Sequence, residues 1–174
     1  VASYMGGGPG TSIYKSTDHG NTWIEIKNGL PNSNLGKIGL AISPFDSTIV
    51  YAAVETDRRN GAVYKTTNSG GNWKKMSDTV SGATGPHYYQ ELVASPHVFD
   101  KIYLMDTKVQ VSENGGKDFY VMNESDKHVD NHSLTFKMSD PNYLLIGTDG
   151  GVYESFDDTN SWKFVANLPL TQFY

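Results

Sequence analysis

One eight-residue pattern occurs four times in this chain of 174 residues. Each copy begins with a hydroxyl residue, has Asp or Asn at its third position and an aromatic residue at its eighth, and three copies have Gly at the fifth position. The copies begin 50, 46 and 43 residues apart, a period that indicates a repeat protein with one supersecondary unit per copy. The residues concerned are Ser16, Asp18, Gly20 and Trp23; Thr66, Asn68, Gly70 and Trp73; Ser112, Asn114, Gly116 and Phe119; and Ser155, Asp157, Thr159 and Trp162.

Each copy has the composition of a tight turn between two strands. The short Asp or Asn side chain accepts hydrogen bonds from backbone N–H groups two or three residues further on, and Gly supplies the positive φ that such a turn needs. The aromatic residue then begins the next strand and fixes the turn to the sheet by burying a large apolar face. The fourth copy has Thr159 in place of Gly, which predicts a distorted turn or one of another type.

The pattern resembles the Asp box, also called the BNR repeat, of sialidases, family-74 xyloglucanases and sortilin-type propellers. In those families the box is structural and lies between the third and fourth strands of a blade. The resemblance therefore implies an all-β fold, a β-propeller segment of about four blades of four-stranded antiparallel sheet. No helical periodicity competes with this interpretation.

The strands are clearest in the second unit. The runs 38–42, 49–54, 62–65 and 73–76 give four short strands around the second copy of the pattern, which together make one blade. The third and fourth units repeat the arrangement. The first unit contains only its later strands, so the chain opens partway through a blade.

These strands divide one continuous propeller domain into blades. We expect a partial first blade in 1–36, a second blade in 37–85, a third in 86–131, and a fourth blade with the start of the next in 132–174. A propeller with this period needs more than four blades in most cases, so we expect a fragment of a larger propeller. The expected partners include the remaining blades of the parent protein or another chain that closes the propeller, because open blades expose strand edges.

Composition excludes several classes of function. The net charge is −5 and the 14 Lys and Arg residues form no cluster, which argues against nucleic acid as a partner. The sequence has no apolar run long enough to span a membrane. It has no Cys, so it can form neither disulfides nor thiolate metal sites. The glycine-rich residues 6–10 lack the Lys and Ser or Thr of a phosphate-binding loop, so a plain loop is favoured there.

Alternating strand direction sorts the loops of each blade onto two faces. The repeated turns share one face with the turns between first and second strands. The loops between second and third strands share the other face with the connections from blade to blade. In the families that this chain resembles, ligands and catalytic groups gather on that second face, which therefore supplies the candidate site.

Two loops of the second face are candidates for ligand binding. Arg58 and Arg59 could clamp a carboxylate, as the arginine triad of sialidases does, although a solvated hairpin loop is favoured. Tyr88 and Tyr89 lie in a blade-to-blade connection. Exposed rings there would stack on a sugar or peptide, whereas buried rings would pack neighbouring blades, and the sequence leaves both open.

The densest group of titratable residues is His128, Asp130 and His132. Alternation would place all three on one side of an extended segment that enters the fourth blade. There they could ligate a divalent metal or bind ligand as acid and base groups. A hydrogen-bonded His–Asp pair that braces the channel is the favoured alternative, so no cofactor is required and a divalent metal is an open option.

Asp149 is the candidate catalytic residue. The run 148–153 resembles the segment of family-74 glycoside hydrolases that carries one of their two catalytic carboxylates, in the loop between second and third strands. The resemblance implies that Asp149 is one member of that pair. A Thr-Asp-Gly-Gly run is also a good turn, which is the alternative.

A wider resemblance covers nearly the whole chain. The runs 88–92, 128–132, 149–155 and 167–174 are similar to large exported bacterial propeller proteins that are labelled glycosyl hydrolase or sortilin-like. This resemblance implies that the protein is secreted, on the cell surface or periplasmic. Two functions are open: a propeller that binds glycan or peptide at its channel face, which we favour, and part of a glycoside hydrolase that uses paired carboxylates.

Overall fold

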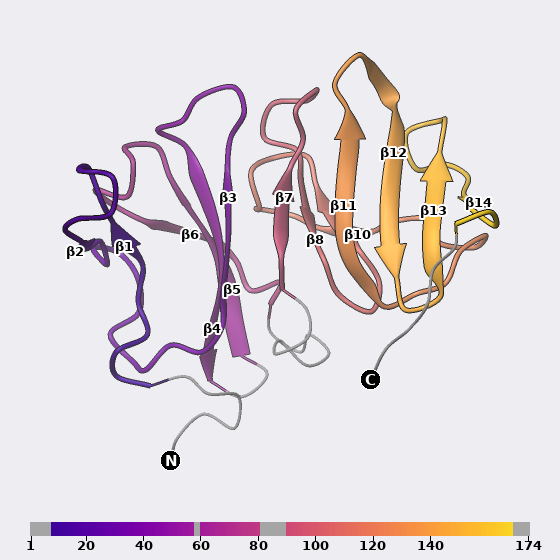
Figure 1. Cartoon of the computed structure of the whole chain (residues 1–174). Helices are drawn as coiled ribbons and strands as arrows, with labels where there is room; N and C mark the ends of the chain where they lie inside the picture. The colour runs from indigo at the N-terminus through magenta and orange to yellow at the C-terminus, as the bar shows by residue number, and fades with distance from the viewer. Residues whose placement is uncertain (1–7, 58–59, 81–89, 169–174) are drawn as a thin grey trace.

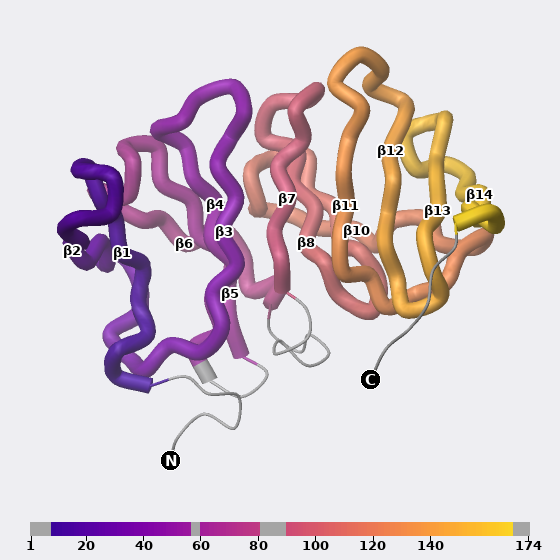
Figure 2. The backbone as a smooth tube through the Cα atoms, viewed as in Figure 1, coloured from indigo at the N-terminus to yellow at the C-terminus, as the bar shows by residue number. Residues whose placement is uncertain are grey.

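The computed structural model describes residues 8–57, 60–80 and 90–168 (Figure 1). In these ranges the fold is all-β, as predicted, with three four-stranded antiparallel sheets and one two-stranded sheet. The sheets follow one another in chain order like the ribs of a fan, from indigo to yellow (Figure 2). None of the described segments forms a helix long and apolar enough to cross a membrane.

Every sheet is an antiparallel meander whose strands pair in sequence order. The first sheet holds β1 (Tyr14–Lys15) and β2 (Ile24–Glu25). The second holds β3 (Ile38–Ile42), β4 (Val50–Asp57), β5 (Asn60–Thr66) and β6 (Lys74–Ser77). The third holds β7 (Leu92–Ala94), β8 (Ile102–Leu104), β9 (Gln110–Ser112) and β10 (Tyr120–Val121). The fourth holds β11 (Asn131–Lys137), β12 (Asp140–Thr148), β13 (Gly151–Ser155) and β14 (Lys163–Phe164).

The four copies of the pattern fold into one and the same turn, hereafter the repeat turn. In each, the hydroxyl of the first residue donates to the side-chain oxygen of the third at 2.8 to 3.0 Å. The same hydroxyl accepts from the backbone N–H of the fifth residue at 2.8 to 3.1 Å. The side chain of the third residue accepts from the backbone N–H of the seventh at 2.8 to 3.0 Å. Side-chain oxygens thus satisfy backbone donors that the reversal of the chain would leave unpaired.

The expectation that the fourth turn is distorted is wrong. In every copy the fourth and fifth residues have positive φ, and Thr159 adopts +73° where Gly20 has +88°. A threonine in this left-handed region is strained. The turn forms nonetheless, because the Thr159 N–H reaches Ser155 Oγ at 3.0 Å and Asp157 accepts from both the N–H and the hydroxyl of Ser161.

Two aromatic residues of the repeat turns, Trp73 and Trp162, link neighbouring sheets by hydrogen bonds. Trp73 and Trp162 are 3% and 6% exposed, and their indole N–H groups donate to the carbonyls of Ile26 and Asn123 in the preceding sheet. Trp23 instead is 61% exposed and donates to Gly20 in its own turn. The predicted burial of the aromatic residue therefore holds for Trp73 and Trp162 and fails at the first copy.

The core consists of apolar layers between successive sheets. Each layer combines one face of a sheet with the facing side of the next, as expected when strand side chains alternate. Burial of about 25 cal/mol per Å² of apolar surface makes these layers the main source of stability. The central members are Ile13, Leu30, Val54 and Tyr64 in the first layer; Tyr51, Val63, Ile102 and Leu104 in the second; and Tyr103, Met105, Leu144 and Ile146 in the third.

A buried ion pair lies where the third and fourth sheets meet. Lys127 Nζ is 3.0 Å from Glu124 Oε1, and the two side chains are 0% and 4% exposed. Burial lowers the pKa of Lys127, while the hydrogen bond and the charge of Glu124 act to raise it. Asn131 completes the network, because its side chain accepts from Lys127 at 2.6 Å and donates to Glu124 at 3.0 Å. Glu124 Oε1 is thus shared between Lys127 and Asn131, whereas Glu124 Oε2 is buried without a hydrogen-bond partner among the described residues.

Substituting the residue at the fifth position of a repeat turn tests whether its left-handed backbone is strained. Thr159→Gly should raise the free energy of unfolding by roughly 0.5 kcal/mol, because relief of left-handed strain outweighs the lost backbone restriction. Gly70→Ala should lower it by about 1 to 2 kcal/mol, since φ is +86° and the new Cβ would lie 2.3 Å from Ile26 Cδ1. Urea denaturation measures both. A loss of stability in Thr159→Gly would show that Thr159 is not strained in this turn.

Acid should destabilise the repeat turns that have Asp at the third position and should not affect those that have Asn there. Hydrogen bonds from Thr22, and then from Ser16, lower the pKa of Asp18 from 3.8 to about 2. Because the folded pKa is depressed, this turn's contribution to stability is present above pH 4 and is lost as the pH falls towards 2. The Thr22 amide resonance should therefore shift with a midpoint near pH 2, whereas the Asn72 amide, bonded to Asn68, should not titrate. A Thr22 midpoint near 4 would show that the bonds to Asp18 do not form.

Candidate functional site

The candidate site lies at the end of the fourth sheet opposite to its repeat turn. There the hairpin from β12 to β13 meets the segment that leads into β11, at the lower edge of the sheet in Figure 1. The backbone pairing of Asn131 with Thr148 brings these two segments side by side. The site is thus on the face where the sequence predicts ligand-binding loops.

His132 and Asp149 form an exposed pair in this site. His132 Nε2 lies 2.7 Å from Asp149 Oδ1, and the two side chains are 40% and 61% exposed. The hairpin closes without help from that carboxylate, because the Gly150 N–H donates to Thr148 Oγ1 at 3.1 Å and Thr148 Oγ1 donates to the carbonyl of Gly151. Asp149 therefore presents a carboxylate oriented by an imidazole rather than one used by its own loop.

His128 and Asp130 both contact the hairpin between β12 and β13 that carries Asp149. His128 Nδ1 lies 2.6 Å from the carbonyl of Val129, and its ring covers Gly150, where an added Cβ would lie 2.6 Å from His128 Cγ. The carbonyl of Asp130 accepts from the Asp149 N–H at 3.2 Å. Gly150 is thus required for close contact with His128.

The predicted one-sided arrangement of His128, Asp130 and His132 is wrong. Asp130 has φ +61°, which interrupts the extended backbone that alternation requires. Its N–H donates to the carbonyl of Thr107 in the preceding sheet, which explains the bend. Across the described residues, no three His, Asp or Glu side chains are grouped so that they could hold a metal ion.

The other predicted binding residues fall outside the described ranges. Arg58 and Arg59 lie between β4 and β5, and Tyr88 and Tyr89 lie in the connection before β7. The strand before this loop is longer than the predicted run 49–54. Glu55 belongs to β4 and is 1% exposed, because its Oε2 accepts from the Lys37 N–H at 3.0 Å and its backbone pairs with Gly61.

A polar cluster where the second and third sheets meet was not predicted. Gln90 is 2% exposed and donates to the carbonyls of Lys37 and Ala53, which clamps the start of the third sheet to the second. Lys37 Nζ and Glu91 Oε1 form an ion pair of 2.6 Å beside it. The signal in the sequence was an amide residue near the start of the first strand of a blade: Gln90 lies two residues before β7, and Asn131, the first residue of β11, likewise donates to carbonyls of the preceding blade, those of Asp106 and Thr107.

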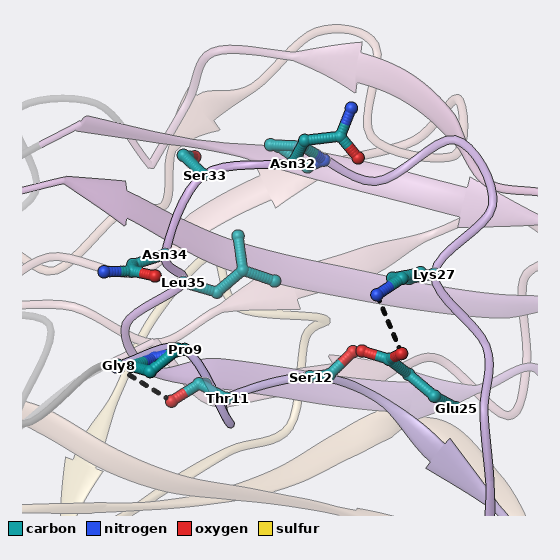
Figure 3. Close-up of a pocket in the computed structure, with 11 residues that line it drawn as sticks. Gly8, Pro9, Thr11, Ser12, Glu25, Lys27, Asn32, Ser33, Asn34 and Leu35 are labelled. Atoms are coloured by element: carbon teal, nitrogen blue, oxygen red, sulfur yellow. Dashed lines mark hydrogen bonds and ion pairs between the residues drawn. The ribbon is translucent and has the colours of Figure 1, made fainter.

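A small hollow of about 220 Å³ lies beside the first sheet (Figure 3). Its walls include Gly8, Thr11 and Leu35, and a Glu25–Lys27 ion pair of 2.8 Å crosses one side. Glu25 raises the pKa of Lys27, and Lys27 lowers that of Glu25. Because Lys27 is paired with Glu25, its positive charge is compensated, and the hollow is not a good binding site for an anion.

The His132–Asp149 pair has the chemistry of a polar ligand site. A carboxylate accepts hydrogen bonds from hydroxyl groups, and an imidazole can donate or accept depending on its tautomer. The same two groups serve as general base and orienting partner in many enzymes. Exposure leaves both within reach of a ligand at the end of the sheet.

No family model and no curated protein sequence matches this chain. Solved structures do. A GH74 enzyme of Niastella koreensis superimposes with a TM-score of 0.67 at 14% identity over 90% of this chain and 27% of its own. The GH74 xyloglucanase of Xanthomonas campestris gives 0.68 at 19% identity over 91% and 28%. An ancestral GH74 enzyme gives 0.64 at 19% identity over 89% and 21%.

The likeness shows the fold. Those proteins are β-propellers, so the fan of sheets is a β-propeller segment and each complete sheet is a blade. This chain spans about a quarter of the length of the GH74 structures that it resembles. The predicted fold class is confirmed, with the repeat turn between the third and fourth strands of each complete blade.

The His132–Asp149 pair should contribute little to stability. His132→Ala should change the free energy of unfolding by less than about 1 kcal/mol, since solvent screens an exposed pair. Gly150→Ala in the same hairpin should cost about 1 to 3 kcal/mol, because its Cβ would overlap His128. Urea denaturation of both variants tests this. A loss above about 2 kcal/mol for His132→Ala would show that the pair is structural.

Proposed function

We propose that this chain is part of a secreted BNR/Asp-box β-propeller that binds glycan on the face carrying His132 and Asp149. One observation carries the proposal: a carboxylate and an imidazole 2.7 Å apart are both exposed, 40% and 61%, at the end of a rigid blade. Polar groups held on rigid elements bind with little loss of conformational entropy.

The geometry suits sugar hydroxyls. A hydroxyl can donate to the free lone pairs of the Asp149 carboxylate while its oxygen accepts from a second donor. Hydrogen bonds to a charged group contribute more to binding than those between neutral groups. The likeness to GH74 propellers, one of them a xyloglucanase, supports a glycan rather than a peptide as the ligand.

The repeat turns belong to the scaffold in this proposal. Their polar atoms bond one another within each turn, as in the structural Asp boxes of the families that the sequence resembles. They also lie on the face opposite to the candidate site. Export to the cell surface or beyond follows from the same resemblance and agrees with a glycan ligand.

Glycoside hydrolysis is the second candidate function. It is favoured by the placement of Asp149, whose carboxylate is exposed and oriented by His132 rather than bonded to the amide of Gly150. Hydrolysis needs a second carboxylate across the scissile bond. If the protein is a hydrolase, this second carboxylate comes from another part of the propeller.

Calorimetric titration with xyloglucan, β-glucan and sialoside oligosaccharides tests the binding function. Asp149→Asn should weaken binding roughly 10-fold to 100-fold, which is the loss of a hydrogen bond to a charged acceptor. The matched control is Asp118→Asn, an exposed carboxylate in a repeat turn on the opposite face, which should leave affinity unchanged. Absence of binding, or equal losses in both variants, would refute the proposal.

Sugar release from the same oligosaccharides separates the two functions. A binding propeller should leave every oligosaccharide intact over hours. Release by the natural protein that disappears in Asp149→Ala would establish hydrolysis and assign Asp149 to it. Release that persists in Asp149→Ala would place the reaction elsewhere.

A further inference from the structure

The surroundings of His128 determine which of its two ring nitrogens carries the proton. Its Nδ1 lies 2.6 Å from the backbone carbonyl of Val129. A carbonyl oxygen only accepts hydrogen bonds, so Nδ1 must be the protonated nitrogen that donates. In a neutral imidazole the other nitrogen, Nε2, then has a lone pair and no proton. His128 is exposed, and no described residue bonds to Nε2, which is therefore a hydrogen-bond acceptor available to a ligand.

The His128 ring is held in place from two sides. The buried Lys127 Nζ donates to the backbone carbonyl of His128 at 3.1 Å and lies 3.0 Å from Glu124 Oε1, which fixes the backbone. On the other side, His128 Cγ and Cδ2 lie 2.6 and 2.8 Å from the place where a Cβ of Gly150 would be. Nε2 is bonded directly to Cδ2, so its lone pair lies beside Gly150. A group fixed in this way binds with little loss of conformational entropy.

The same hairpin uses its hydrogen-bond donors within the protein. Asp149 Oδ1 lies 2.7 Å from His132 Nε2, and a carboxylate only accepts, so that nitrogen is the donor. A neutral His132 then has no second N–H. The backbone N–H groups of Asp149 and Gly150 donate to Asp130 and Thr148. A ligand beside Asp149 therefore meets acceptors, the carboxylate and His128 Nε2.

The charges around the hairpin agree with this inventory. The segments 128–132 and 148–151 contain two Asp and no Lys or Arg. Lys127, directly before the first segment, is 0% exposed and paired with Glu124. Lys108 is exposed but belongs to another loop, between β8 and β9 of the third blade. A ligand carboxylate at the hairpin would meet acceptor lone pairs and a like charge, both of which oppose binding.

We propose that His128 is a second ligand-binding residue of this site, whose Nε2 accepts a hydrogen bond from a sugar hydroxyl, and that the site thereby rejects sugars that present a carboxylate. The inference rests on the proposed glycan-binding function and deepens it. A hydroxyl group can donate to His128 Nε2 or to Asp149, whereas a carboxylate can donate to neither. Sialosides and uronate-containing glycans are thus excluded at this hairpin.

Nitrogen NMR of the histidine rings in the natural protein tests the first step without any ligand. At about pH 8, above the usual titration of imidazole, the protonated and unprotonated ring nitrogens have well-separated resonances. His128 should carry its proton on Nδ1 and none on Nε2. A proton on Nε2 in the neutral ring would remove the acceptor and overturn the proposal.

Calorimetric titration with two oligosaccharides of the same length and linkage tests the specificity. A cello-oligosaccharide and a glucuronan differ only in a hydroxymethyl or a carboxylate group on each sugar. The natural protein should bind the cello-oligosaccharide at least about tenfold more tightly. His128→Asn keeps a donor near the place of Nδ1 and has no atom at that of Nε2, so it should weaken this binding roughly tenfold. His128→Gln, whose amide reaches the place of Nε2, should retain more of the affinity.

The control is Asp118→Asn in a repeat turn on the opposite face, which should leave both affinities unchanged. Urea denaturation should show the His128 variants folded. Binding of the cello-oligosaccharide that His128→Asn leaves unchanged, or tighter binding of the glucuronan, overturns this inference and leaves the proposed function standing. Absence of binding to either oligosaccharide and to xyloglucan refutes the proposed function and this inference together.

Discussion

The hydrogen bond between the hydroxyl and the Asp or Asn side chain in each repeat turn is the interaction on which the rest of the structure depends. It orients an oxygen that accepts the N–H of the seventh residue, so two consecutive left-handed residues become tolerable, even at Thr159. The turn then delivers an aromatic residue to a fixed place. In the second and fourth blades that residue is Trp, and its N–H fastens the blade to the one before it.

This arrangement separates scaffold from site. The polar side chains of each repeat turn form hydrogen bonds within the turn, and neighbouring blades cover the strands between the turns. The other ends of the strands carry the buried Gln90 and Asn131, which bond neighbouring blades, and also exposed polar groups that packing does not require, His132 and Asp149 among them. A site placed there can change its ligand without disturbing the turns, which is how propellers and other repeat folds combine constant scaffolds with variable loops.

Short-range features were predictable from the sequence and long-range ones were not. The repeat turns lie where the pattern places them, because their hydrogen bonds span at most four residues. The distortion expected at Thr159 was wrong, because side-chain bonds to the backbone outweigh its strain. The predicted strand 49–54 stopped before Glu55, which is instead a buried residue of β4 that accepts from the Lys37 N–H, 18 residues away. His132 and Asp149 were each predicted as candidate site residues, but their contact with one another depends on the pairing register of β11 with β12.

In the proposed function, the end of the fourth blade opposite to its repeat turn binds glycan through Asp149. A crystal structure of the protein with a xyloglucan oligosaccharide tests it most directly. We expect a sugar hydroxyl within about 3 Å of the Asp149 carboxylate, on the side that His132 leaves free. A sugar bound at the repeat turns, or at any place that leaves Asp149 and His132 without contact, would contradict it.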